Sequence, residues 1–127
     1  MLEGEKLPVI EASRVRLRHL EETDIDALYE IFSDAQAMRY WSSPPFQKRA
    51  EAEKLLADIH DLFRRKQLFQ WGIALKAGDR IIGTTTLFQL DEQSGRAEIG
   101  YILDRRQWKK GFISEALTAL FDFAFGE

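Results

Sequence analysis

Three extended segments between residues 69 and 103 follow one another with only short turns between them. In the first, large apolar side chains alternate with smaller or polar ones, at Phe69, Trp71, Ile73 and Leu75. The second, residues 81–88, is rich in β-branched side chains, and the third covers residues 96–103. The glycine-containing turns at 77–80 and 91–95 are too short for a crossover helix, so neighbouring segments must run antiparallel. The middle of the chain is therefore predicted to fold as a three-stranded antiparallel meander.

The first part of the chain supplies a further strand, residues 14–20. Its alternation puts three arginines on one face and three less polar side chains on the other, namely Arg14, Arg16 and Arg18 against Val15, Leu17 and His19. The arginine face is predicted to be solvated, with a substrate site as the alternative, and His19 to be a core histidine. Residues 1–13 show no strong pattern and are predicted to be a loose lead-in.

Two helices are expected before the meander. Thr23, with Asp26 three residues later, resembles an N-cap, and an apolar stripe then runs to about Ser33. A second helix is predicted from Gln47, with a stripe of Ala52, Leu55, Leu56, Ile59, Leu62 and Phe63. The loop between the helices, residues 35–46, holds Met38, Tyr40, Trp41 and Phe46, which either pack onto the domain or form a pocket wall.

A last helix is predicted after residue 111 and is apolar around most of its circumference. Its core stripe is expected at Ile113, Ala116, Leu117, Leu120 and Ala124, and its other side carries Ala119, Phe121, Phe123 and Phe125. A helix of this kind is buried on more than one side. Earlier elements could wrap it, a partner could cover it, including a second copy in a homo-oligomer, or the natural protein could continue further.

The predicted order of elements is β-α-α-β-β-β-α in a single domain, residues 1–127. A mostly antiparallel sheet with flanking helices belongs to the α+β class. The net charge of −3 argues against nucleic-acid binding through a broad basic face. With no cysteine and only two histidines, a metal site is not expected. The N-terminus lacks signal-peptide character and no apolar run could span a membrane, so a cytoplasmic location is predicted.

The loop before the last helix gathers most of the positive charge in this acidic chain. Residues 104–111 carry four cations, Arg105, Arg106, Lys109 and Lys110, and lead directly into the helix start. Free backbone N–H groups and the positive end of the helix dipole favour an anion there. Cations at that position oppose the dipole, which points to an anionic ligand such as a pyrophosphate; the alternative is a solvated turn.

These features together resemble the GNAT family of N-acetyltransferases, in the branch that includes the ribosomal-protein-alanine acetyltransferases. The resemblance begins at Arg14 and covers almost all of the chain from there to its end. Its strongest residues are Glu98, Gly100 and Tyr101 on the strand, followed by Trp108, Gly111 and residues 114–116.

The resemblance implies acetyl-CoA as acetyl donor and a primary amine, at a protein N-terminus or on a small molecule, as acceptor. The pantetheine arm would pair with the strand, residues 99–103. The implied contacts with acetyl-CoA come from Ile102, Leu103, Arg105, Arg106, Trp108, Lys109, Lys110, Gly111, Phe112, Ile113 and Ser114. Glu98 is the candidate general base, with a solvated or ion-paired glutamate as the alternative, and Tyr40 and Trp41 are candidate acceptor contacts.

The family loop has the form Arg/Gln-x-x-Gly-x-Gly/Ala, which falls here on residues 106–111. Arg106 and Gly111 match, but Lys109 replaces the first glycine. A glycine at such a position supplies a positive φ or a close backbone approach, and we expect lysine to give up both.

The family fold normally continues with a strand, a helix and a terminal hairpin, none of which this sequence contains. The chain is thus expected to be a partial acetyltransferase domain. This leaves two alternatives to an active enzyme, namely a non-catalytic CoA-binding or interaction module, and an inactive truncated fragment.

Overall fold

The computed structural model describes residues 4–39, 43–91 and 96–125, and within them the chain forms one antiparallel sheet. The strands lie in chain order, β1 (Ile10–Glu11), β2 (Val15–Arg18), β3 (Leu68–Leu75), β4 (Ile81–Asp91) and β5 (Arg96–Leu103). The helices are α1 (Ile25–Phe32), α2 (Arg49–Arg64) and α3 (Phe112–Phe125), with short 3₁₀ turns η1 (Glu22–Asp24) and η2 (Arg105–Gln107). The predicted meander and the α+β class are confirmed.

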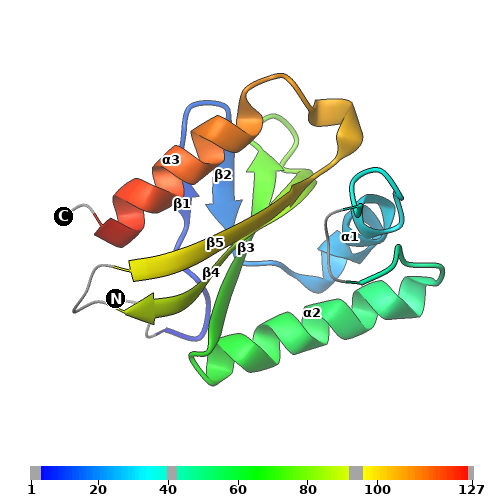
Figure 1. Ribbon diagram of the computed structural model, residues 1–127, viewed down its shortest axis with the longest axis horizontal. Helices are drawn as coiled ribbons and strands as arrows, with labels where there is room; N and C mark the ends of the chain where they lie inside the picture. The colour runs from blue at the N-terminus through cyan, green and yellow to red at the C-terminus, as the bar shows by residue number, and fades with distance from the viewer. Residues whose placement is uncertain (1–3, 40–42, 92–95, 126–127) are drawn as a thin grey trace.

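Helices cover the sheet on both sides, α3 on one face and α1 with α2 on the other (Figure 1). On β3, Trp71 faces α3, and its ring meets Phe123 edge-on with centroids 6.0 Å apart. Gly72 faces the other layer, where an added Cβ would come within 2.6 Å of side-chain carbons of Leu20 and Ile81. Because both faces of β3 are buried, the alternation of its side chains is one of size rather than of polarity.

The start of the chain is more ordered than its sequence indicates. Within the described residues, Leu7 and Ile10 are buried in the core under α3, and Ile10 pairs with Leu17 in the sheet. Pro8 contributes its carbonyl oxygen, which accepts a hydrogen bond of 2.9 Å from Trp71 Nε1. The prediction of a loose lead-in was wrong because two or three isolated apolar residues create no detectable period.

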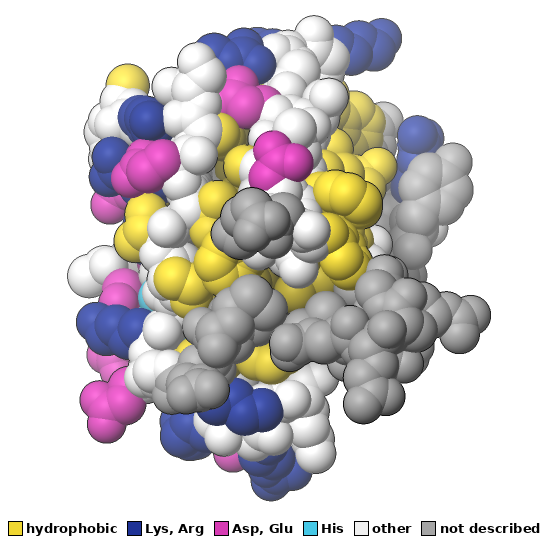
Figure 2. Space-filling view, turned by 90° about the vertical axis from the view of Figure 1, so that its left-hand side faces the viewer, with side chains coloured by type: hydrophobic (Ala, Val, Ile, Leu, Met, Phe, Trp, Pro, Cys, Tyr) yellow, Lys and Arg dark blue, Asp and Glu magenta, His cyan; other side chains and the backbone are white. Residues whose placement is uncertain are grey.

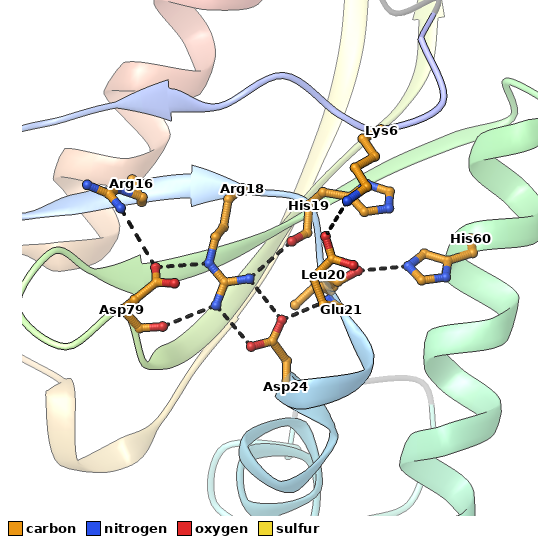
Figure 3. A network of polar contacts seen from close by, with 9 residues as sticks. All are labelled: Lys6, Arg16, Arg18, His19, Leu20, Glu21, Asp24, His60 and Asp79. Carbon is orange, nitrogen blue, oxygen red and sulfur yellow. Dashed lines mark hydrogen bonds and ion pairs between the residues drawn. The ribbon is translucent and has the colours of Figure 1, made fainter.

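Arg18 is held in an ion-pair network rather than in solvent (Figure 3). Its guanidinium donates to both carboxylate oxygens of Asp24 at 2.9 Å and to Asp79 Oδ1 at 3.0 Å. The bonds to Asp24 raise the pKa of Arg18 above its ordinary value. Arg18 thus joins β2 to η1 and to the β3–β4 turn, so neither predicted use of this arginine, solvation or substrate binding, describes it.

Asp24 also starts the first helix. Its carboxylate accepts the N–H of Glu21 at 2.8 Å, and the chain then passes through η1 into α1. The predicted N-cap at Thr23 with Asp26 was therefore wrong, and Asp26 pairs instead with Arg49 on α2. The capping box is formed instead by Glu21 and Asp24, at the start of η1.

The last helix buries a different stripe from the one expected. Ala116 and Leu120 are buried as predicted, but Phe112 completes the stripe, whereas Ile113 and Leu117 are only half-buried. Phe121 is 55% exposed. Hydrophobic side chains gather on the end of the molecule where α3 finishes (Figure 2). Within the described residues, no helix is both long and apolar enough to cross a membrane.

The two histidines of the chain lie stacked against each other, with ring centroids 4.9 Å apart and planes within 3°. His19 Nδ1 accepts the N–H of Leu7 at 3.1 Å, and His60 Nε2 contacts the carbonyl of Leu20 at 2.8 Å. Burial, and next the neighbouring His60, hold the pKa of His19 below its ordinary value of 6.5, while Glu21 opposes and Lys6 adds to the effect. The neutral ring therefore helps to hold the N-terminal segment on the sheet.

This geometry predicts a loss of stability in mild acid. Because the pKa of His19 is lowered on folding, its contribution is complete above pH 6.5 and is lost as the pH falls through the folded-state pKa. We expect the free energy of unfolding, measured with urea, to be lower at pH 5.5 than at pH 7.5. A His19→Gln variant should show a smaller difference between the two pH values, and equal differences in the two proteins would contradict the prediction.

Candidate functional site

A cavity of about 420 Å³ lies where β5 ends, between the segment that follows α1 and the start of α3. Eight of the residues predicted to contact a ligand line it, namely Ile102, Leu103, Trp108, Lys109, Gly111, Phe112, Ile113 and Ser114. Gln36, Ala37 and Arg39 form the opposite wall, and Tyr101 and Gln107 complete the lining. Arg105, Arg106 and Lys110 lie outside this lining.

One edge of β5 borders this cavity. In the described sheet β5 is the last strand and pairs only with β4. The outer edge of such a strand presents backbone N–H and C=O groups with no strand partner, ready to pair with an extended ligand. Tyr101, which is 51% exposed, is the first of the three residues of β5 that line the cavity.

The two arginines of the loop are engaged with carboxylates of α1 and of the loop itself. Arg105 forms an ion pair of 3.2 Å with Asp34, which follows α1. Arg106 pairs with Glu30 on α1 and with Asp104 at 2.6 Å. The hydrogen bond to Asp104 raises the pKa of Arg106 above its ordinary value. These contacts tie the loop to α1, and a role of the arginines as phosphate ligands stays a prediction.

Asp104 organises the loop and was not singled out in the sequence. It is buried, and its Oδ1 accepts the N–H of Arg106 at 2.9 Å, which caps η2. Burial alone would raise the pKa of this carboxyl, but the side-chain and backbone bonds from Arg106 outweigh it and the pKa is lowered. An aspartate directly before a turn is a typical N-cap, and that signal could have identified it.

Lys109 adopts the backbone conformation that a glycine would supply. Its φ is +65°, and Gly111 two residues later has a φ of +83°. The expectation that lysine gives up the positive φ was therefore wrong, because tertiary contacts override the local preference. A non-glycine residue in this region costs about 1 kcal/mol or somewhat more. Such strain persists only where the surroundings hold it.

The two lysines are the cations of the loop that remain for a ligand. Among the described residues, no carboxylate forms an ion pair with either of them. Lys110 Nζ has one long contact, 3.4 Å, with Gln107 Oε1, and both lysines are exposed. The four cations of the loop thus differ in their pairing: the two arginines form ion pairs with carboxylates, whereas the two lysines form none with the described residues.

The first turn of α3 lines the cavity and carries backbone donors that have no partner within the helix. Phe112, Ile113 and Ser114 form this turn. The first helical bond runs from Glu115 N–H to the carbonyl of Gly111, at 3.1 Å. Trp108 Nε1 donates to the carbonyl of Leu103 at 3.0 Å and fixes the indole beside this turn. Backbone donors and two lysines together suit a phosphate group.

Three candidates remain, of which the structure describes only Glu98. Glu98 is exposed on β5, four residues before Ile102, and outside the cavity lining. Tyr40 and Trp41 lie outside the described residues, so their predicted role stays a prediction. Across the described segments, no group of three or more histidine or acidic side chains is arranged to hold a metal ion.

Comparison with known proteins places these features in context. A family model described as the acetyltransferase (GNAT) domain matches residues 14–127. The uncharacterized N-acetyltransferase p20 of Bacillus licheniformis is 38% identical over 112 residues, covering 88% of this chain and 63% of that protein. The spermidine N(1)-acetyltransferase of Escherichia coli (strain K12) is 26% identical over 115 residues, covering 90% of this chain and 59% of that protein. The chain therefore spans about three fifths of the length of these two relatives.

A solved structure has the same fold. RimL, the ribosomal L7/L12 alpha-N-protein acetyltransferase in complex with coenzyme A, superposes with a TM-score of 0.74 and 21% sequence identity. The superposition covers 91% of this chain and 67% of that protein. At this identity the likeness establishes the fold.

The strain at Lys109 can be measured. We expect Lys109→Gly to raise the free energy of unfolding by about 0.5–1 kcal/mol, because glycine adopts a positive φ without a steric penalty. Lys110→Gly is the matched control, since Lys110 does not have a positive φ and glycine there should destabilise by about 0.5–1 kcal/mol. Urea denaturation of the three proteins tests this, and equal shifts in the two variants would refute it.

Proposed function

The chain belongs to the GNAT family of acetyltransferases, and on that premise we propose that it binds acetyl-CoA and transfers the acetyl group to a primary amine. The observation that carries the proposal is the single cavity that joins the free edge of β5 to the first turn of α3. A ligand with an extended arm and an anionic group fits this cavity, because the arm can pair with the edge of β5 and the anion can bind at the first turn of α3.

The anionic end of acetyl-CoA is proposed to bind at the start of α3. Backbone N–H groups of the first turn, beginning at Phe112, would donate to the pyrophosphate. Lys109 and Lys110 would supply the compensating charge, because they are exposed and no described carboxylate forms an ion pair with them. Ser114, which lines the cavity, would donate its hydroxyl.

The pantetheine arm is proposed to run along β5, away from the loop. Its amides would pair with the free backbone groups of residues 99–103 as an added strand would. Coenzyme A is bound in the RimL complex, whose fold this chain shares, and this supports the assignment. The thioester would then lie toward Glu98, which is about 13 Å from Ile102 along the strand.

Glu98 is proposed as the general base. The acceptor arrives as an ammonium ion, which must lose a proton to the base before its nitrogen attacks the thioester carbonyl. The C–S bond then breaks, and the thiolate of CoA takes up the second proton that the nitrogen loses as the amide forms. An exposed carboxylate at the end of the arm could take that proton through water. Unpaired N–H groups of β5 would stabilise the developing oxyanion.

The acceptor is proposed to approach from the segment that follows α1. Gln36 and Arg39 line that wall of the cavity, and Tyr40 and Trp41 come next in the chain. Relatives differ in their acceptors, since one is named for spermidine and another for a ribosomal protein. Both a small amine and a protein N-terminus are therefore candidate acceptors.

Binding without turnover is the second candidate function. It is favoured by one observation, that no carboxylate or imidazole is among the described residues lining the cavity. The lysine in place of the first loop glycine does not favour this alternative, because Lys109 keeps the positive φ that the glycine would supply.

Calorimetric titration with acetyl-CoA tests the binding proposal. A Lys109→Ala/Lys110→Ala variant should bind about tenfold more weakly or worse, with a shallower dependence on salt, because two charges near the phosphates are lost. Lys54→Ala is the control, since Lys54 lies on α2 and pairs with Asp58. Absence of binding by the folded unmodified chain, or equal affinity in all three proteins, would reject the proposed site.

Thiol release from acetyl-CoA in the presence of an amine panel tests catalysis. The chain has no cysteine, so it contributes no thiol to the signal. We expect Glu98→Gln to lower kcat about 100-fold while the affinity for acetyl-CoA is unchanged, because only proton removal is impaired. Binding with no thiol release on any amine would favour the second candidate function, and an unchanged kcat would exclude Glu98 as the base.

A further inference from the structure

Arg14 joins the start of β2 to the loop and to α3. Its Nη1 donates to the carbonyl of Lys110 at 2.9 Å, and its Nε donates to Glu115 Oε1 at 2.8 Å. The guanidinium also lies over the ring of Phe112, 4.5 Å from the centroid. One side chain therefore holds three points around the turn that precedes α3.

The bond to Lys110 sets the direction of the next N–H group. The peptide unit between Lys110 and Gly111 is planar and trans, so its carbonyl and its N–H point in opposite directions. With the carbonyl aimed at Arg14, the N–H of Gly111 is aimed away from Arg14. Gly111 lines the cavity and Arg14 does not, so Arg14 acts on the cavity through this peptide.

Glu115 would otherwise compete for the same site. A carboxylate in the first turn of a helix is attracted to the unpaired N–H groups there. Here its oxygens accept instead from the backbone N–H groups of Arg14 and Val15 and from the Arg14 side chain. Burial opposes the charge, but these bonds outweigh it and hold the pKa of Glu115 below its ordinary value. The donors of α3 thereby stay available to a ligand.

The strained backbone next to Lys110 needs such a support. Lys109 has a φ of +65°, a conformation that lysine rarely adopts and that relaxes unless neighbouring contacts hold it. On the preceding side, Trp108 is tied to Leu103. On the following side, the tie is the bond from Arg14 to Lys110.

We propose that Arg14 is a positioning residue for the anion-binding turn, resting on the proposed function for the identity of the ligand. Its side chain holds the peptide between Lys110 and Gly111 in the orientation that presents the Gly111 N–H to the cavity. Together with the backbone N–H groups of Arg14 and Val15, it also keeps the carboxylate of Glu115 away from the start of α3.

The test compares Arg14→Ala and Arg14→Lys with Arg16→Ala. Arg16 is the matched control, because it lies two residues further on, in β2, and pairs with Glu11 and Asp79, neither of which belongs to the loop before α3. Two quantities are measured in each folded protein, the affinity for acetyl-CoA by calorimetry and the position of the Gly111 amide signal in a ¹H–¹⁵N spectrum without ligand. Thermal melting shows that each variant is folded.

We expect Arg14→Ala to weaken acetyl-CoA binding about tenfold, which corresponds to the loss of one charged hydrogen bond, and to shift the Gly111 signal. Arg14→Lys should have an affinity between those of the unmodified chain and Arg14→Ala, since lysine can donate to one acceptor but cannot reach two acceptors at once as the planar guanidinium does. Arg16→Ala should change neither quantity. Equal losses in Arg14→Ala and Arg16→Ala, or an unchanged affinity in Arg14→Ala, would overturn the proposal.

The two proposals fail in distinguishable ways. If the unmodified chain does not bind acetyl-CoA, the proposed function fails, whereas a Gly111 shift specific to Arg14→Ala still supports the positioning role. If the unmodified chain binds acetyl-CoA and the Gly111 signal is the same in all variants, the positioning role is overturned and the proposed function stands.

Discussion

The burial of β3 on both faces is the constraint on which the rest of the structure depends. It pairs with β4 along nearly its whole length and with β2 along its second half, and both of its faces are covered by helices. On one face Trp71 packs against Phe123 of α3. On the opposite face Gly72 leaves room for the side chains of Leu20 and Ile81. The two helical layers then end on either side of β5, and the cavity lies between them. The site is a consequence of how the central strand is packed.

Charge in the site is divided between structural and available groups. Arg106 pairs with Glu30 on α1, and Arg105 pairs with Asp34, which follows that helix. Glu115, the first carboxylate of α3, pairs with Arg14 at the start of β2. Each of these pairs fixes an element without placing a permanent anion at the start of α3. The neighbouring lysines have no such partner among the described residues. An arrangement of this kind holds the loop in shape while its positive potential stays directed at a ligand, which is the basis of the proposed acetyl-CoA site.

Much of the fold could be predicted because strong local signals marked it. Short turns required an antiparallel meander, and i, i+3, i+4 spacing marked α2. The basic loop before a helix, marked in the sequence as a candidate anion site, contributes Lys109 and Gly111 to the lining of the cavity. Asp104, Glu115 and Arg14 were missed as organisers, because each acts through a partner that is either a backbone group or about 100 residues away. Asp104 carried only the local signal of an N-cap before a turn, whereas Glu115 and Arg14 show no sequence pattern that reveals their distant partners.

The sequence by itself determined strands β2 to β5 and their order with the helices, the family resemblance and the place where positive charge meets a helix start. These depend on neighbours within a few residues, which the chain specifies directly. Only the tertiary structure decided which cations are engaged, that Lys109 takes a positive φ, and that the N-terminal segment joins the sheet. Those outcomes depend on contacts between distant segments. The energy of such contacts exceeds local conformational preferences of about 1 kcal/mol, so the local sequence cannot decide them.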